Sequence, residues 1–294
     1  MTEEKKPDTR LSYSSATLLK NCSMKYYHHK VANTARDPDA EQNYDAFNVG
    51  KAFHFVMEEN NHSEDKLDEL LTAACKAFEV EEHEGMLKAM LLRYLQVHKK
   101  SGLRAIMCEL SLSTPLFIGF IDVILIDDKT QEWWIADLKT AARYSPVTAA
   151  KLAQDTQLNL YCSFAQEIAE TAGLGLDFKK FMGARYRVTT KSALKRKITE
   201  SFREHVLRTA KNVKSYDVIV PKEIMDPQGF FAEHKKLHAK TLRLRKGTLK
   251  PEMNRSYCDS FFKPCEFWSQ CHGGKTYTEC STLLKAITTD NLNE

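Results

Sequence analysis

Apolar residues in the first third of the chain recur at three- and four-residue spacing, which is typical of amphipathic helices. This pattern predicts helices over residues 12–31, 47–58, 64–80 and 84–99. Ser12 is placed to cap the first helix, and Cys22 lies in its middle. Residues 12–100 are therefore predicted to form a helical N-terminal region that carries Cys22 and His54.

The pattern changes at residue 103, where three short runs of β-branched and aromatic residues begin. The runs read LRAIMCELSLST, FIGFIDVILID and EWWIADLK, and turn residues separate them, so they predict a meander of three strands. A long helix over 146–172, a strand over 181–188 and a basic helix over 195–214 are predicted to follow. The order predicts an α/β core over 103–190, with helical elaborations before and after it.

The composition fits one large domain. The chain has 294 residues, 43% of them hydrophobic, and we expect a single domain over 1–294. No apolar run approaches the roughly 18 residues of a membrane span. The N-terminal sequence MTEEKKPDTR resembles neither a secretory signal nor an Arg-rich presequence, so the expected location is the cytoplasm.

Charge is unevenly distributed, although the formal net charge is only +4. Residues 58–84 are strongly acidic, whereas residues 185–250 are strongly basic. A basic block over 191–250 could follow a phosphate backbone, or it could be an ordinary solvated helical face. Four aromatic residues in or beside this block could stack on bases or belong to the core: Tyr186, Phe202, Phe230 and Phe231.

Three charged residues lie at facing positions of the second and third predicted strands. Asp122 interrupts the apolar run of the second strand, and Asp137 and Lys139 end the third. Because side chains alternate along a strand, Asp137 and Lys139 point to the same face and Leu138 points to the other. Two carboxylates that meet across neighbouring strands repel each other unless a cation lies between them, and oxygen ligands suit Mg²⁺ or Mn²⁺.

Four short motifs occur along the chain in a fixed order. They are Gly50-Lys-Ala-Phe-His54, Gly119-Phe-Ile-Asp122, Asp137-Leu-Lys139-Thr140 and Gln157-Leu-Asn-Leu-Tyr161. In this order they resemble the motifs of the PD-(D/E)XK nuclease superfamily, in particular its RecB-like branch, which includes phage recombination exonucleases and CRISPR-associated adaptation nucleases. The resemblance spans roughly residues 12–272. It implies a restriction-endonuclease-like α/β core with a mixed central sheet in βββαβ order.

The resemblance also implies roles for these residues. Asp122 and Asp137 would bind a divalent metal ion, with the Leu138 carbonyl and His54 as further ligands. Lys139 would be the catalytic lysine, and Gln157 and Tyr161 would contact the DNA strand or position that lysine. Glu109 is either an additional acid near the metal or a charge at a strand edge.

Eight cysteines are present, and four of them crowd the last fifth of the chain: Cys258, Cys265, Cys271 and Cys280. In a cytoplasmic protein such a cluster favours a metal site over disulfides, and residues 255–280 are predicted to be a Cys-rich metal segment. Cys22 and the first three of these cysteines resemble the ligand set of a [4Fe–4S] cluster in members of the same branch. A zinc ion on the same thiolates, Cys280 in place of Cys22, and unligated cysteines remain alternatives.

The resulting interpretation is a Mg²⁺- or Mn²⁺-dependent DNA nuclease, with an exonuclease in recombination or phage DNA processing as the first choice. It would bind DNA without sequence specificity, because no motif for base readout is present. A recombination protein is a possible partner, and the sequence leaves the oligomeric state open. The alternatives are a non-catalytic DNA-binding or interaction subunit with a nuclease-like fold and a structure-specific endonuclease.

Overall fold

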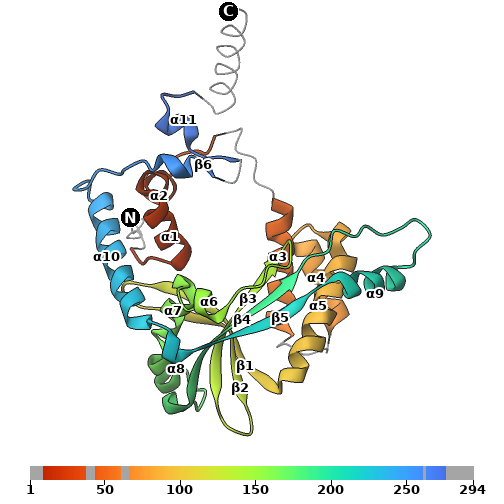
Figure 1. Ribbon diagram of the computed structural model, residues 1–294. Coiled ribbons are helices and arrows are strands. Elements are labelled where there is room, and N and C mark those ends of the chain that lie inside the picture. The colour runs from red at the N-terminus through yellow and green to blue at the C-terminus, as the bar shows by residue number, and fades with distance from the viewer. Residues whose placement is uncertain (1–8, 38–43, 61–65, 261–262, 276–294) are drawn as a thin grey trace, which may run out of the picture. The chain divides into compact units, whose positions relative to one another are not determined.

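A five-stranded mixed sheet forms the centre of the computed structural model, which describes residues 9–37, 44–60, 66–260 and 263–275 (Figure 1). The strands are β1 (Leu103–Ser113), β2 (Ile118–Asp127), β3 (Trp133–Ala141), β4 (Phe181–Thr190) and β5 (Ser215–Pro221), and they lie in the sheet in this order. β2 and β3 are antiparallel, β3 and β4 parallel, and β4 and β5 antiparallel. The predicted α/β class, with its mixed sheet in βββαβ order, is confirmed.

The chain divides into two compact units. The sheet unit comprises Asn43–Ser113 and Gly119–Ala232, and the terminal unit comprises Met1–Gln42, Thr114–Ile118 and Glu233–Glu294. Cys22 therefore belongs to the terminal unit, and His54 to the sheet unit. The predicted sequence regions cut across this division, because both ends of the chain contribute to the terminal unit.

Helices cover both faces of the sheet in the sheet unit (Figure 1). On one face, α3 (Tyr44–Glu59) and α5 (Glu84–His98) contact the strands, and α4 (Leu67–Ala77) and α9 (Phe202–Asn212) pack against these helices. The connection from β3 to β4 supplies α6 (Ala149–Leu152), α7 (Thr156–Cys162) and α8 (Ala165–Thr171). Short 3-10 helices are η1 (Glu81–His83), η2 (Lys99–Ser101), η3 (Phe178–Lys180) and η4 (Lys222–Ile224).

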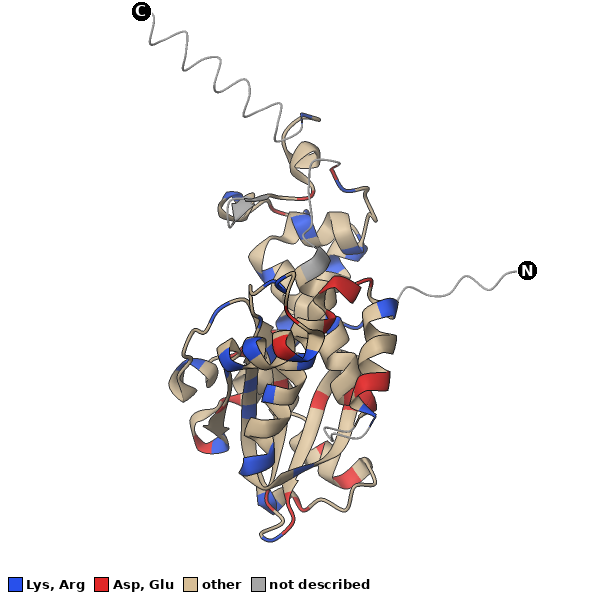
Figure 2. Cartoon of the chain, turned by 90° about the vertical axis from the view of Figure 1, so that its right-hand side faces the viewer, with Lys and Arg blue, Asp and Glu red and all other residues tan. Residues whose placement is uncertain are grey.

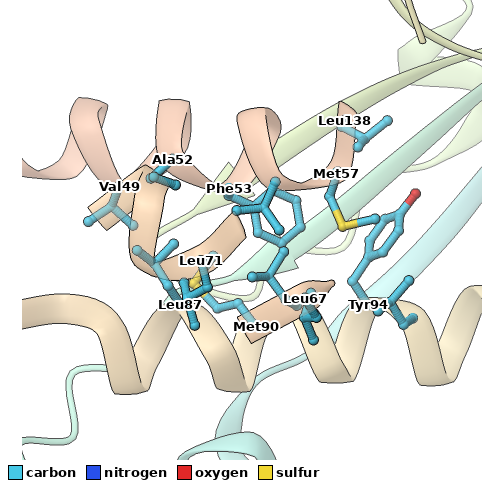
Figure 3. Packing of buried hydrophobic residues seen from close by; sticks show 14 of the residues in the cluster. Val49, Ala52, Phe53, Met57, Leu67, Leu71, Leu87, Met90, Tyr94 and Leu138 are labelled. Carbon is cyan, nitrogen blue, oxygen red and sulfur yellow. The ribbon is translucent and has the colours of Figure 1, made fainter. Parts of the chain in front are cut away.

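The core between α3, α4, α5 and the sheet is apolar (Figure 3). Phe53 and Met57 of α3 pack with Leu87 and Met90 of α5, and all four are buried. Leu138 of β3 joins the same core. Because neighbours alternate along a strand, its burial turns Asp137 and Lys139 toward the opposite face.

The terminal unit is built from α1 (Tyr13–Asn21), α2 (Ser23–Lys30) and most of α10 (Pro227–Arg245). Leu11, Leu19, Tyr26 and Leu244 are buried in its apolar core. Its remaining elements are η5 (Arg255–Tyr257), β6 (Asp259–Ser260), β7 (Lys263–Pro264) and α11 (Trp268–Cys271).

Three predicted helices differ from the structure. The helix predicted over 12–31 breaks at Cys22, whose extended backbone (φ −155°, ψ 107°) makes it the N-cap of α2. The helix predicted over 146–172 is split into α6, α7 and α8, and the break before α7 is at Asp155, whose side chain accepts a hydrogen bond from the backbone N–H of Leu158. The helix predicted over 195–214 begins only at Phe202, after the capping box of Ser201 and Glu204.

Strand β5 was not predicted, although Tyr216–Val220 is rich in β-branched and aromatic residues. Its pairing with β4 also explains part of the basic block. Arg185 and Arg187 of β4 are buried, and both guanidinium groups contact Asp217 of β5. Buried in this way, these two arginines are not available to phosphate. Figure 2 shows Lys and Arg in blue and Asp and Glu in red along the described chain.

Gly183 in β4 is required by the backbone, and its replacement by alanine is expected to destabilise the protein strongly. Its φ is +121°, and an added Cβ would lie 2.3 Å from the carbonyl oxygen of Val220. We expect Gly183→Ala to lower the free energy of unfolding by about 2–5 kcal/mol in urea denaturation. The control is Gly173→Ala, which also has a positive φ but no atom near the added methyl, and which should cost about 1 kcal/mol. Equal losses for the two variants would contradict this account.

In the parts of the chain that the structure describes, no helix combines the length and apolar character needed to cross a membrane.

Candidate active site

The antiparallel register of β2 and β3 brings the strand carboxylates together. Val123 pairs with Ala136, so Asp122 and Asp137 are the next residues along the two strands. The backbone N–H of Leu138 donates a 2.6 Å hydrogen bond to Oδ2 of Asp122. Asp122 is therefore held against the end of β3, beside Asp137 and Lys139.

Helix α3 adds a histidine to these carboxylates. Nδ1 of His54 lies 3.9 Å from Oδ1 of Asp122, and the backbone of Leu138 forms a hydrogen bond to the His54 ring. One turn earlier, Gly50 faces Thr140, where an added Cβ would lie 3.2 Å from Oγ1. The small residue in the G-x3-H motif thus lets α3 approach the end of β3 closely.

Glu109 of β1 completes a group of three possible metal ligands. Ligand atoms of His54, Glu109 and Asp122 all lie within 4.8 Å of one another, which is the one such group of three or more among the described residues. Glu109 has a φ of +46°, an unusual backbone conformation for a non-glycine residue in a strand. Local backbone distortions of this kind re-aim side chains at functional sites, and this one accompanies a glutamate directed at Asp122.

Burial and mutual repulsion disfavour the charged forms of these acids. Burial, and after it the charges of Asp122 and Glu58, raise the pKa of Glu109 to about 7. Burial also raises the pKa values of Asp122 and Asp137, while Lys139 opposes the shift in both. Oδ2 of Asp137 is buried without a hydrogen-bond partner. A divalent cation would satisfy this oxygen and relieve the repulsion, so the donor set fits a hard metal ion.

Lys139 is linked to α7 by a chain of hydrogen bonds. Its Nζ donates to Oδ1 of Asp137 at 2.8 Å and to Oε1 of Gln157 at 3.0 Å. Nε2 of Gln157 then donates to the Tyr161 hydroxyl at 3.0 Å, one helical turn further on. Burial disfavours the ammonium, but the charges of Asp137 and Asp122 outweigh it and raise the pKa of Lys139. Lys139 is therefore a fixed, protonated donor.

Two residues near the site were not predicted from the sequence to be neighbours of the metal ligands or of Lys139. Glu58 follows His54 by one helical turn, and its charge raises the pKa values of Glu109 and Asp122. The four-residue spacing from His54 was the available signal. Tyr186 lies opposite Asp137 in the β3–β4 register, and its half-buried ring shares the face of the sheet that carries Lys139.

The pKa of Glu109 leads to a prediction about the metal-free protein. Between its ordinary pKa of 4.5 and the value of about 7 in the folded state, the folded protein holds a proton that the unfolded chain has released. The free energy of unfolding should therefore fall as pH rises through this window. We expect Glu109→Gln to flatten this decline in urea unfolding with EDTA between pH 5 and 8. The exposed control Glu69→Gln should leave the slope unchanged, and an unchanged slope in Glu109→Gln would contradict the prediction.

A second set of candidate ligands lies in the terminal unit. Cys22 and Cys258 are buried, and Cys265 and Cys271 are half-buried. The Cys22 charge raises the pKa values of the other three thiols, after burial as the larger cause, so the four side chains lie near one another. Cys280 lies outside the described residues.

Hydrogen bonds connect this group of cysteines to the N-terminal and the C-terminal segments of the terminal unit. The backbone N–H groups of Lys25 and Asn254 each donate to Sγ of Cys22 at 3.4 Å. The N–H of Cys265 donates to the Cys258 carbonyl at 2.7 Å. Backbone donors directed at sulfur are typical surroundings of metal-bound thiolates.

Comparison with known proteins identifies the family. A sequence model of the PD-(D/E)XK nuclease superfamily matches residues 10–272. The chain belongs to this superfamily. Members of the PD-(D/E)XK superfamily use divalent metal ions, and the group of His54, Glu109 and Asp122 is a possible site for one.

Structural comparison agrees on the fold. The crystal structure of a candidate exonuclease from Eubacterium rectale matches with a TM-score of 0.51 and 13% sequence identity, over 92% of this chain and 89% of that chain. At this identity the likeness shows the PD-(D/E)XK fold alone. No curated protein sequence matches the chain.

Proposed function

We propose that the protein is a Mg²⁺- or Mn²⁺-dependent DNA nuclease that hydrolyses phosphodiester bonds at DNA ends or in single strands. The observation that carries the proposal is the close group of His54, Glu109 and Asp122 beside Asp137 and Lys139. Burying the Oδ2 atom of Asp137 without a hydrogen-bond partner costs free energy. A protein that only binds DNA would gain nothing from this cost, whereas a nuclease would use the oxygen as a metal ligand. Recombination or phage DNA processing, with a recombination protein as partner, is the proposed setting.

The protein's acids and histidine would hold the metal. Asp122, Asp137, Glu109 and His54 offer side-chain ligands, and Leu138 offers its backbone carbonyl. A divalent ion bound there polarises a phosphoryl oxygen and lowers the pKa of bound water. The backbone N–H of Leu138 fixes the orientation of the Asp122 carboxylate through its hydrogen bond to Oδ2.

Lys139 is placed to act as a donor. Because its pKa is raised by the neighbouring carboxylates, the ammonium form dominates at neutral pH. Such a group orients a water molecule and stabilises negative charge on the phosphoryl group. Gln157 and Tyr161 are positioning residues in this account, since their hydrogen bonds restrain Nζ of Lys139.

Cys22, Cys258, Cys265 and Cys271 are proposed to bind a [4Fe–4S] cluster. Four thiolates are the ligand set of such a cluster, and the backbone N–H groups directed at Cys22 Sγ suit a metal-bound sulfur. A zinc ion on the same four thiolates is the rival, and metal analysis distinguishes the two.

The proposed function is tested with end-labelled linear DNA, single-stranded and duplex, alongside covalently closed circles of each kind. The wild-type protein should release labelled nucleotides from linear DNA in Mg²⁺ or Mn²⁺ and none in EDTA. Cleavage of closed circles at the same rate would replace the exonuclease by an endonuclease. Salt-dependent binding without cleavage at any divalent metal concentration would overturn the proposal in favour of a non-catalytic DNA-binding protein.

A further inference from the structure

Three aromatic side chains are exposed around the candidate active site. Phe47 on α3 is 61% exposed, Tyr144 in the segment after β3 is 58% exposed, and Phe120 on β2 is 50% exposed. These are not the aromatic residues that the sequence pattern suggested for base stacking. Those four, at positions 186, 202, 230 and 231, are all half-buried.

Phe47 lies on the face of α3 that carries His54. Spacings of four and three residues place Phe47, Lys51 and His54 on one side of the helix. Phe47 is therefore about 10 Å along the helix axis from the histidine. The Lys51 ammonium lies 4.4 Å from the Phe47 ring centroid, so one ring face carries a cation and the other remains accessible.

The start of α3 is hydrogen-bonded to the segment that follows β4, at the carboxyl ends of β3 and β4. Nζ of Lys191, just after β4, donates to the carbonyl of Ala46, and the Lys191 N–H donates to the carbonyl of Ala141 at the end of β3. The carboxyl ends of the parallel strands β3 and β4 therefore meet the first turn of α3. Phe47 is next to this junction.

Tyr144 lies near the same carboxyl ends, next to β5. Lys139 pairs with Val188 of β4, and Val188 pairs with Tyr216 of β5, so the three side chains share a row and a face. Tyr216 is thus about 10 Å from Lys139, two strand spacings away. The Tyr144 ring packs edge-on against the Tyr216 ring at 5.3 Å, and the Tyr216 hydroxyl donates to the Ser145 carbonyl at 2.9 Å. Exposed Arg143 accompanies Tyr144.

Phe120 lies on β2, which is next to β3 in the sheet. It precedes Asp122 by two residues and so shares its face of β2. Exposed rings held by a rigid scaffold, each near a cation or a metal ligand, are what an unpaired base can stack on. Bases inside a duplex are already stacked on one another and cannot use such rings.

From this arrangement we infer that Phe47, Phe120 and Tyr144, with Lys51 and Arg143, form a base-stacking rim that selects single-stranded DNA for the active site. The inference rests on the proposed nuclease function and names its substrate class. The cations contact phosphates, and the rings hold the nucleotides that flank the bond to be cleaved.

The test measures binding of a fluorescein-labelled single-stranded oligonucleotide and of a blunt duplex, by anisotropy without added divalent metal. Phe47→Ala and Tyr144→Ala should each weaken single-strand binding roughly tenfold and change duplex binding less than about twofold. Phe178→Ala is the matched control. Phe178 is 45% exposed, but it lies just before the amino end of β4, at the opposite end of the strand from the proposed rim. It should change neither affinity. Phe120 is not varied, because it lies beside Asp122.

A second substrate separates stacking from a general loss of affinity. Abasic sites in the single strand keep the phosphates but remove the bases. The wild-type protein should lose at least as much affinity on this substrate as either variant loses on the intact strand, and the two variants should bind the abasic strand with the wild-type affinity. Equal loss on single strands and duplex, or no loss on either, would overturn the inference even if the wild-type protein cleaves DNA. Failure of the wild-type protein to cleave any DNA would instead overturn the proposed function.

Discussion

Lys139→Ala should lower the rate of DNA cleavage by at least about 10²- to 10³-fold, measured with end-labelled linear DNA in saturating Mn²⁺. The reason is that Nζ of Lys139 is the fixed cation beside the carboxylates, and groups that stabilise developing charge contribute about this much. The effect should fall on the catalytic rate rather than on DNA affinity, because one lysine is a small part of the phosphate contacts.

Lys129→Ala is the control for this change. Lys129 is exposed in the turn between β2 and β3, at the other end of the strand that carries Lys139. Its replacement should leave the rate within about twofold. If Lys139→Ala retained full cleavage while its circular dichroism spectrum matched that of the wild type, the assignment of Lys139 would be wrong.

Cys265→Ser should bleach the protein and destabilise its terminal unit. Protein purified without oxygen should be brown and contain four irons per chain, and the variant should lose the colour and most of the iron. Because ligand binding to the folded state adds to stability, the thermal midpoint should fall by roughly 5 °C or more. Anaerobic absorbance, metal analysis and thermal unfolding measure the three effects.

Cys108→Ser supplies the matched control for the thiol. Cys108 is half-buried like Cys265, but it lies on β1 in the sheet unit. This variant should keep the colour and the iron. A colourless wild-type protein with one zinc ion per chain would replace the cluster by zinc, and a metal-free wild type would leave the four thiols unligated.

The strands at the site were the most predictable part of the fold. Their runs of β-branched residues indicate the strands, and alternation determines which side chains share a face, so the sequence alone places Asp137 and Lys139 side by side. Leu138 shows why this works, because its burial in the core on the opposite face leaves no freedom to shift the register by one residue.

Other features depend on contacts that no local pattern encodes. Glu109 could be read as a metal ligand or as an edge charge, and its positive φ, which directs it toward Asp122, has no signature in a strand sequence. Cys22 was expected inside a helix, but contacts with Asn254, more than 200 residues away, accompany its extended backbone. Strand β5 has a local strand pattern that was missed, but the pairing of its Asp217 with arginines of β4 has no signal in the sequence.

The chain belongs to a nuclease superfamily, and Asp122 and its neighbours are proposed to hold the catalytic metal. The most direct measurement is Mn²⁺ binding by electron paramagnetic resonance, compared between the wild type and Asp122→Ala, together with cleavage of linear single-stranded DNA. Asp122→Ala should keep the wild-type circular dichroism spectrum but lose both bound Mn²⁺ and cleavage. Retention of both bound Mn²⁺ and cleavage by Asp122→Ala would contradict this proposal.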